Sequence, residues 1–224
     1  MKSKQFLQLI IVCFALFCGS AVQAAGPSAI TAKNWAEDKG NLLLETFQGK
    51  DLAVKYKKLD ELFLQYVDLP YISKFVIGKH WREMTPGQQQ RYQNLFKRYA
   101  LGTYKSFPLS FEYPITFKIN NADVGQNYTD VWAFIDLGDN LQQQDGELTK
   151  QINVMFRLTG RGSNIKIIDI KLAESSLILS YRNRFYQMVA GVDGDMEWFL
   201  EDLENTVVST EKTNRLKLQN NHAE

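Results

Sequence analysis

The sequence predicts a single α+β domain, in which N-terminal helices, a four-stranded twisted antiparallel sheet and C-terminal helices follow one another along the chain. Three observations predict this fold class. Apolar residues recur at helical spacing before residue 108, they alternate with polar residues in four segments between 111 and 172, and helical spacing returns after 175. We expect the helices to cover one face of a curled sheet.

The first 24 residues are expected to be a signal peptide that precedes the domain. Lys2 and Lys4 come before the apolar run 6–17, and small residues ending at Ala24 resemble a cleavage site. The apolar run is shorter than the roughly 20 residues that a membrane span needs. The predicted division is a cleaved signal peptide (1–24), one domain (25–208) and a polar C-terminal tail (209–224), with export of the mature protein.

Both cysteines, Cys13 and Cys18, lie in the expected signal peptide. Cys18 could mark a lipoprotein, but the preceding Phe17 is not the small residue that lipid modification favours. Without a thiol, the mature chain has no disulfide, thiolate metal site or cysteine nucleophile. Its formal charge changes from +1 to −1 when Lys2 and Lys4 are removed, so there is no basic field for nucleic acid or an anionic membrane.

The residues before Pro70 have helical periodicity, and Pro70 ends this pattern because the residue before a proline avoids helical geometry. In the next segment Gly78 would allow a neighbouring helix to approach closely. We expect helical segments at 29–35 leading into 41–47, at 51–66 and at 71–81.

A further helix has a clear start signal. Thr85 is a good N-cap, Pro86 suits the first helical position, and Gln88 completes the pattern of a capping box. Apolar residues at helical spacing extend this helix to about Phe107, and its expected buried face is rich in aromatic residues, including Tyr92, Phe96, Tyr99 and Tyr104.

Four segments alternate between apolar and polar residues, which is typical of half-buried antiparallel strands. Pro114 lies on the polar side of the first segment and suggests an edge strand. We expect Asn120 and Asn121 to form the first turn and 138–147 to be a long hairpin loop. The expected strands are 111–119, 128–137, 152–158 and 165–172, paired as an antiparallel meander.

Helical periodicity returns after the sheet. Ser175 or Ser176 can cap a helix that reaches about Val189, and the residues 191–194 then interrupt the pattern. A last helix is predicted at 195–208, followed by a polar and frayed segment, 210–224.

The sequence has none of the common signatures of a hydrolase, metalloprotease or nucleotide-binding protein, and its two histidines, His80 and His222, are far apart in the chain. Three strand carboxylates could face inward as an acid/base set, or lie on the wet face, or pair with basic residues. These are Asp130, Asp136 and Asp169, with Lys166, Lys171 and Arg157 as the basic candidates. No active site and no metal site is predicted.

The apolar rows of the strands and the aromatic face of the helix after Thr85 allow two interpretations. They can close on each other as an ordinary core, or a curled sheet can leave a cavity between sheet and helices for an apolar ligand. Periodicity alone does not decide between them.

Two blocks of residues resemble the MlaC/toluene-tolerance family of periplasmic phospholipid-binding proteins, which are auxiliary components of ABC transporters. The block from Asp68 through Gly78 and Trp81 to Thr85, Pro86 and Gln88 is similar to the family's D…V-L-G-x-x-W…T-P-x-Q pattern. The segments 165–169 and 176–185 resemble its W-K-V-Y-D and S-L-V-x-x-Y-R-x-x-F patterns, although the glycine of the family's E-G-x-S is missing at 173–176.

The resemblance implies transport without catalysis and without a cofactor, since the bound phospholipid is cargo. It implies a periplasmic carrier that exchanges phospholipid with an outer-membrane lipoprotein complex and with an inner-membrane ABC transporter complex through its membrane-anchored substrate-binding subunit. Such exchange maintains the lipid asymmetry of the outer membrane. An enzyme on a cone-like α+β scaffold and a periplasmic assembly or chaperone module are the alternatives.

On this interpretation, apolar and aromatic residues of both layers would surround the acyl chains, and basic residues at the mouth would meet the phosphate. The head-group candidates are Lys79 and Arg182. The predicted lining residues are Phe75, Val76, Tyr99, Tyr104, Tyr113, Ile115, Phe117, Phe134, Val154, Phe156, Leu177, Tyr181 and Phe185.

Overall fold

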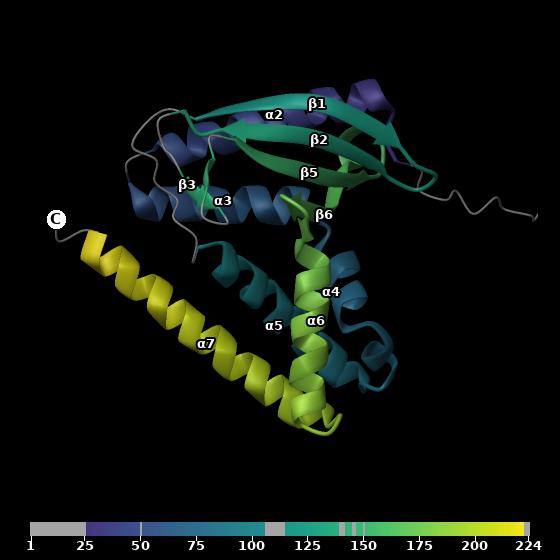
Figure 1. Ribbon diagram of the computed structural model, residues 1–224. Helices are drawn as coiled ribbons and strands as arrows, with labels where there is room; N and C mark the ends of the chain where they lie inside the picture. Colours follow the sequence, from purple (N-terminus) through teal and green to yellow (C-terminus); the bar gives the residue numbers. More distant parts are fainter. Residues whose placement is uncertain are drawn as a thin grey trace, which may run out of the picture.

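The computed structural model describes residues 26–49, 51–105, 115–138, 142–144, 147–149 and 151–221. Helices precede and follow an antiparallel sheet, which confirms the predicted α+β class (Figure 1). The helices are α2 (Ala29–Gln48), α3 (Leu52–Tyr66), α4 (Leu69–Ile77), the 3₁₀ helix η1 (Gly78–Arg82), α5 (Pro86–Tyr104), α6 (Leu177–Gly191) and α7 (Met196–Asn221). The strands are β1 (Thr116–Val124), β2 (Thr129–Asp136), β3 (Gln142–Gln144), β4 (Glu147–Thr149), β5 (Gln151–Thr159), β6 (Lys166–Leu172) and β7 (Ser175–Ser176), and the 3₁₀ helix η2 (Gly162–Asn164) precedes β6.

The main sheet has five strands in the order β1-β2-β5-β6-β7, and every neighbouring pair is antiparallel. Four of these five strands, β1, β2, β5 and β6, were predicted from the sequence. The fifth, β7, is only two residues long, which is too short to show an alternating pattern. β1 lies at the edge of the sheet as predicted. The long connection between β2 and β5 contains the separate two-stranded ribbon of β3 and β4.

The first turn of the sheet does not lie at Asn120 and Asn121, as was predicted. β1 continues through both residues, and its register against β2 shifts between Ile119 and Asn121. The extra residue forms a β-bulge, so the polar pair interrupts the alternation without ending the strand. The chain turns at Gly125, whose N–H donates to the carbonyl of Tyr128 over 2.8 Å.

Helix α2 confirms the helical pattern predicted before Pro70 and continues through Gly40 without a break. A Cβ at Gly40 would lie 2.3 Å from the ring of Phe117. Glycine therefore allows α2 to approach β1 closely, and this contact outweighs the helix-breaking tendency of glycine. Asp51 caps α3, with its carboxylate accepting the N–H groups of Ala53 and Val54.

The predicted break near Pro70 is the junction between α3 and α4. Asp68 is the N-cap of α4 and accepts the N–H of Tyr71, while Pro70 lies in the first turn, where its missing N–H costs little. Gly78 ends α4 with φ +56°, and a Cβ there would lie 2.4 Å from the hydroxyl of Tyr186. The expected close approach at Gly78 is thus confirmed, and the neighbouring helix is α6.

Helix α5 begins as predicted. The hydroxyl of Thr85 accepts the N–H of Gln88, and the side chain of Gln88 accepts the N–H of Thr85, which completes the capping box. The helix ends at Tyr104. The end expected near Phe107 lies outside the described residues.

Ser176 caps α6, as predicted. The last helix is longer than predicted, because α7 continues from Met196 to Asn221 instead of ending at 208. The expected frayed segment is held on α5 by Arg98, which pairs with Glu211, and by Asn214, whose side-chain N–H donates to the carbonyl of Gly102 over 3.0 Å. In the described part of the chain, no helix combines the length and apolarity needed to cross a membrane.

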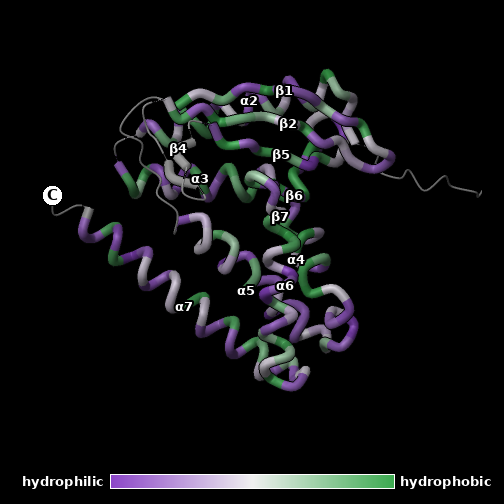
Figure 2. Tube along the Cα trace, in the orientation of Figure 1, coloured by the Kyte–Doolittle hydropathy of each residue, from purple (hydrophilic) through white to green (hydrophobic). Residues whose placement is uncertain are grey.

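The molecule has two main hydrophobic cores. The helical core joins α4, α5, α6 and α7 and includes Tyr92, Phe96, Phe185 and Phe199. The sheet core joins α2 to the sheet and consists of Ala32, Ala36, Val131, Leu158 and Ile165. Hydrophobic residues dominate β5 in Figure 2, whereas hydrophilic residues dominate α7. The aromatic residues of α5 pack against other helices, and inward residues of β2 and β5, such as Val131 and Leu158, pack against α2.

Candidate functional site

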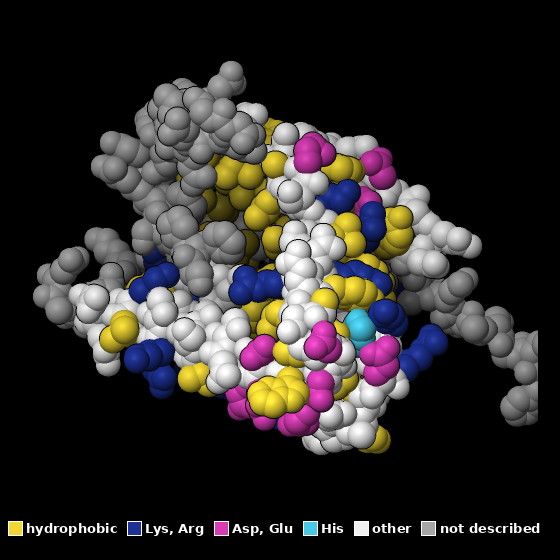
Figure 3. Space-filling model, turned by 60° about the horizontal axis from the view of Figure 1, so that its bottom comes forward, with side chains coloured by type: hydrophobic (Ala, Val, Ile, Leu, Met, Phe, Trp, Pro, Cys, Tyr) yellow, Lys and Arg dark blue, Asp and Glu magenta, His cyan; other side chains and the backbone are white. Residues whose placement is uncertain are grey.

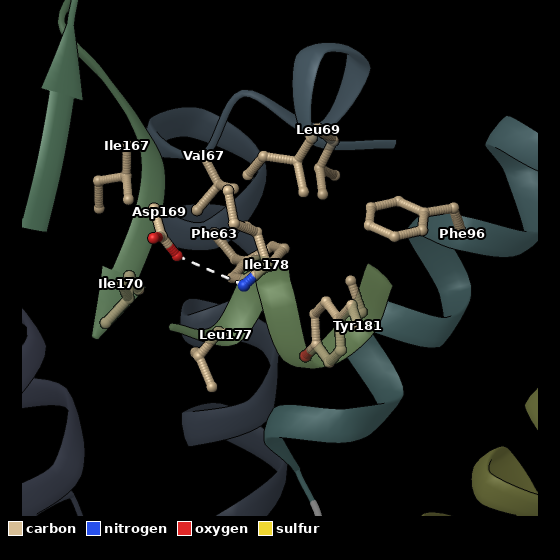
Figure 4. Close-up of a pocket in the computed structure, with 12 residues that line it drawn as sticks. Phe63, Val67, Leu69, Phe96, Ile167, Asp169, Ile170, Leu177, Ile178 and Tyr181 are labelled. Atoms are coloured by element: carbon tan, nitrogen blue, oxygen red, sulfur yellow. Dashed lines mark hydrogen bonds between the residues drawn. The ribbon is translucent and has the colours of Figure 1, made fainter. Parts of the chain in front are cut away.

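A cavity of about 50 Å³ lies where the helical core meets the sheet core. Ile167 belongs to its lining and packs against the sheet core, while Val67 and Ile178 also line it and pack against the helical core. The complete lining consists of Phe63, Val67, Leu69, Ile72, Phe96, Ala100, Ile167, Asp169, Ile170, Leu177, Ile178 and Tyr181 (Figure 4).

Strand β6 forms the sheet side of this cavity. Figure 4 shows Ile167 and Ile170 on the strand at one side and Phe96 on the helix at the other. The junction between α3 and α4 is held against β6 by the N–H of Asp68, which donates to the carbonyl of Ile167 over 2.9 Å, next to a parallel bridge between Val67 and Ile167. This backbone contact places residues of both elements at the same cavity.

Helices α5 and α6 form the opposite side. Phe96 and Ala100 lie one turn apart on α5, so they point to the same side of that helix, and they are only 1% and 2% exposed. Leu177, Ile178 and Tyr181 come from the first turns of α6. The capped start of α6 thus places three cavity residues next to β6.

Asp169 is the one carboxylate of the lining, and its oxygens are engaged. One accepts the hydroxyl of Ser176 over 2.8 Å, and the other accepts the N–H of Ile178 over 3.4 Å (Figure 4). The residue is only 3% exposed. A carboxylate at a helix N-terminus is stabilised by the unpaired N–H groups and the helix dipole. Asp169 therefore fastens α6 to the sheet.

The other polar group of the lining is the hydroxyl of Tyr181. Burial, and then the neighbouring Tyr99, raises the pKa of Tyr181 to about 12. The phenol is consequently neutral under physiological conditions, and the rest of the cavity wall is hydrocarbon. Such a wall suits an apolar ligand and offers little to acid/base chemistry.

The three strand carboxylates do not form the acid/base set that was one of the alternatives. Asp130 pairs with Arg157 through two contacts of 2.8 Å, which confirms the alternative of pairing with a basic residue. This pairing raises the pKa of Arg157. Asp136 accepts the N–H of Gly138 at the far end of β2, while Asp169 caps α6. Each carboxylate therefore has a separate structural partner.

The predicted lining residues occupy several places. Leu177 and Tyr181 line the cavity. Val76, Tyr99 and Phe185 lie in the helical core, where they are 0%, 6% and 0% exposed.

The predicted strand residues lie along the sheet. Val154 and Phe156 are two residues apart on β5 and share the face that Val131 presents to α2, because Phe156 pairs with Val131. Phe117 meets Phe156 with ring centroids 6.0 Å apart, and Ile115 is buried just before β1.

Of the four remaining predicted lining residues, three are described by the structure, and these three are not part of the cavity lining. Phe134 alternates with the inward residues of β2 and lies on the other face, where Lys118 approaches its ring. Tyr104 stacks on Phe63, a cavity residue, at 5.7 Å. Phe75 is half-buried at the contact between α4 and α6. Tyr113 lies outside the described residues.

Neither head-group candidate lines the cavity. Arg182 donates to the carbonyl of Phe75 over 2.9 Å and to the hydroxyl of Tyr186 over 3.1 Å, so it holds α4 against α6. Lys79 is exposed nearby. Figure 3 shows Lys and Arg side chains beside hydrophobic ones at the centre of one face, with Asp and Glu gathered at its lower edge.

Sequence reasoning missed most of the cavity wall. Most of the missed residues come from helix ends and from β6, where apolar residues follow one another without strict alternation, as at Ile167 and Ile168. Such a run indicates a strand that is covered on both faces, and this signal could have pointed to β6. Phe96, in the middle of α5, was predicted to be buried but not to line the cavity. The missed residues are Phe63, Val67, Leu69, Ile72, Phe96, Ala100, Ile167, Asp169, Ile170 and Ile178.

A second hollow of about 360 Å³ has a different character. It lies among α3, α5 and α7 and is lined by ion pairs, including Lys105 with Asp60 at 2.7 Å and Arg98 with Glu211 at 2.8 Å. Within the described residues, no group of three or more His, Cys, Asp or Glu side chains is placed to hold a metal ion.

Comparisons with known proteins agree on the type of fold. Residues 43–205 match a family described as MlaC protein. The structure is similar to that of a phospholipid-binding protein from Ralstonia solanacearum, solved in complex with a phospholipid. The TM-score is 0.63 and the sequence identity 19%, over 80% of this chain and 98% of that chain, so the likeness concerns the fold. No curated protein matches the chain.

Proposed function

Because the chain belongs to the MlaC family, we propose that it is a phospholipid carrier that shelters acyl chains between the sheet and the helices. The observation that carries the proposal is the cavity wall, which is hydrocarbon apart from Asp169 and the hydroxyl of Tyr181. The similar fold of a protein that holds a phospholipid supports the same function. Membership of the MlaC family and the apolar wall of the cavity together favour binding over catalysis.

The energy of burial is sufficient for a carrier. Removing one CH₂ group from water contributes about 0.8 kcal/mol, so a chain of about 16 carbons contributes on the order of 10 kcal/mol before entropy and cavity costs. Spontaneous escape into water would then be slow. Release consequently requires a partner that stabilises an open form.

The cavity must widen to hold an acyl chain. Its volume of about 50 Å³ is far below the roughly 300–1,000 Å³ of pockets that hold larger ligands. The lining residues Ile167, Ile170 and Leu177 are only half-buried. Separation at these contacts would enlarge the cavity along the junction between the two cores.

We further propose that the protein acts in the periplasm after removal of residues 1–24. There the protein carries phospholipid between an outer-membrane lipoprotein complex and the membrane-anchored substrate-binding subunit of an inner-membrane ABC transporter, and so maintains outer-membrane lipid asymmetry. Phospholipid is the cargo, and no cofactor is required. The family and the expected signal peptide support this placement.

The first test is mass spectrometry of an organic extract of the protein, purified from the periplasm without detergent. We expect near-stoichiometric phospholipid, because a buried chain does not dissociate readily. A lipid-free extract from folded protein would contradict the proposal.

A pair of variants locates the lipid. Leu177→Asp places a charge in the hydrocarbon wall, where an unpaired carboxylate is strongly disfavoured, and should lower the retained lipid at least about tenfold. Leu179→Asp is the matched control, because Leu179 lies two residues further on α6, is 50% exposed and does not line the cavity. Equal amounts of retained lipid in the two folded variants would show that this cavity is not the lipid-binding site.

A further inference from the structure

We propose that Phe96 and Ala100 set the length of the acyl chain that the protein accepts, by closing the inner end of the cavity. This inference rests on the proposed lipid-carrying function and adds a selectivity for chain length to it. The ligand is a phospholipid that the protein selects by the length of its acyl chain, independently of its head group.

Phe96 and Ala100 form one continuous surface. They are four residues apart on α5, they both line the cavity, and both are at least 98% buried. Figure 4 shows Phe96 at the side of the cavity opposite Ile167 and Ile170. A chain that enters between the sheet and α6 meets α5 as the far wall.

This wall is held from behind. The ring of Phe96 has its centroid 6.0 Å from that of Tyr92 and 5.9 Å from that of Phe185, and neither of these residues lines the cavity. Tyr92 and Phe185 are fully buried themselves, and Phe199 closes the same cluster. Moving Phe96 would disturb several aromatic contacts at once, because close-packed side chains transmit displacement.

The opposite walls are less deeply buried. Ile167, Ile170 and Leu177 are half-buried and lie where β6 and the start of α6 meet. Widening therefore gains space on the side of β6, while α5 stays in place. The position of the chain end is fixed by the α5 wall, and the side chains at 96 and 100 decide how many carbons fit.

Leucine substitutions at positions 96 and 100 should change the depth of the cavity in opposite directions. Leucine has about three carbons more than alanine and about three fewer than phenylalanine, and packed interiors respond to single methylene groups. Ala100→Leu should shorten the mean bound chain by about two to three carbons, because the added side chain occupies the inner end. Phe96→Leu should lengthen it by a similar number.

The experiment loads the purified mature protein from vesicles of phosphatidylethanolamine with an equimolar mixture of saturated chains of about 12 to about 18 carbons. The bound chains are then measured by mass spectrometry, and thermal unfolding confirms that each variant is folded. Opposite shifts for Ala100→Leu and Phe96→Leu support the proposal.

Phe199→Leu is the matched control, because Phe199 is fully buried in the same core but does not line the cavity. It should keep the original chain-length profile. An unchanged profile in both α5 variants, or an equal shift in Phe199→Leu, would overturn the length selection while lipid binding itself stands. Absence of lipid from the unsubstituted protein would instead overturn the proposed function, and with it this inference.

Discussion

The helical core and the sheet core differ in how completely their aromatic side chains are enclosed. Phe185 of the helical core is fully buried and has ring centroids 5.2 to 6.2 Å from those of Tyr92, Phe96, Tyr99 and Phe199. In the sheet layer Phe117 is only half-buried, and Phe156 is its one aromatic neighbour among the described contacts.

The difference follows from how each core is built. Four helices surround the aromatic cluster from several sides, whereas the sheet core is closed by α2 through small residues such as Ala32 and Ala36. Small residues allow close approach but provide little packing surface. The cavity lies where the interlocked aromatic cluster of the helical core meets the sheet core, whose aromatic residues are less enclosed.

The largest expected effect comes from a substitution in the aromatic cluster. Phe185→Ala should reduce the free energy of unfolding by about 3–5 kcal/mol, because it removes a fully buried ring and leaves a cavity that its neighbours cannot fill. Phe117→Ala should cost about 1–2 kcal/mol, since its half-buried ring loses less contact. Urea unfolding of both variants measures the difference.

Equal destabilisation by the two alanine substitutions would contradict the contrast between the cores. It would mean that the sheet core is enclosed as tightly as the helical core. The m-value should stay constant, because a change in m would indicate a change in the unfolded or native ensemble and not in packing.

A second prediction concerns the connection between the two cores. Ser176→Ala should reduce the free energy of unfolding by about 1–3 kcal/mol, because it removes the N-cap of α6 and leaves an oxygen of the buried Asp169 without its 2.8 Å partner. Ser180→Ala is the matched control, since the exposed Ser180 only donates to the carbonyl of Ser176. Thermal unfolding of both variants provides the measurement.

If Ser176→Ala were no more destabilising than Ser180→Ala, Asp169 would not be a structural connection between β6 and α6. Its burial beside the cavity would then need another explanation. A large effect of the Ser176 substitution together with reduced lipid retention would show that the connection also shapes the cavity.

Local signals in the sequence predicted most of the elements. The capping box at Thr85 fixed the start of α5, and the serine before Leu177 fixed the start of α6, because both depend on neighbouring residues only. The length of α7 could not be predicted in this way. Its second half is polar, and it is held by Arg98 and Gly102 of α5, which are more than a hundred residues away in the chain.

The cavity was less predictable than the fold. Periodicity identified Tyr92, Phe96 and Tyr99 as buried residues of α5 but not Ala100. It also did not show that Tyr92 and Tyr99 face other helices while Phe96 and Ala100 reach the junction with the sheet. That distinction depends on the angle at which α5 crosses its neighbours. Resemblance to a family indicated a cavity between sheet and helices without showing which side chains enclose it.

The smallest expected effect lies in the second half of α7, outside both cores. The hydrogen bond from Arg98 lowers the pKa of Glu211 from its ordinary value of 4.5. The stabilisation of the folded protein by this ion pair is therefore complete above about pH 4.5. It disappears as the pH falls through the lowered pKa that Glu211 has in the folded protein. Its size should be only about 0.2–1 kcal/mol, because the two side chains are 39% and 38% exposed and water screens the pair.

Arg98→Gln should accordingly lower the Tm slightly near neutral pH, and the difference from the unsubstituted protein should vanish between about pH 5 and about pH 3. Arg215→Gln is the control, since Arg215 acts on Glu211 only as a more distant charge and should shift the Tm less. Hydrogen exchange should show faster exchange in the second half of α7 of Arg98→Gln. A difference in Tm that persisted unchanged at low pH would mean that Arg98 stabilises α7 by packing of its side chain and not through the charge of Glu211.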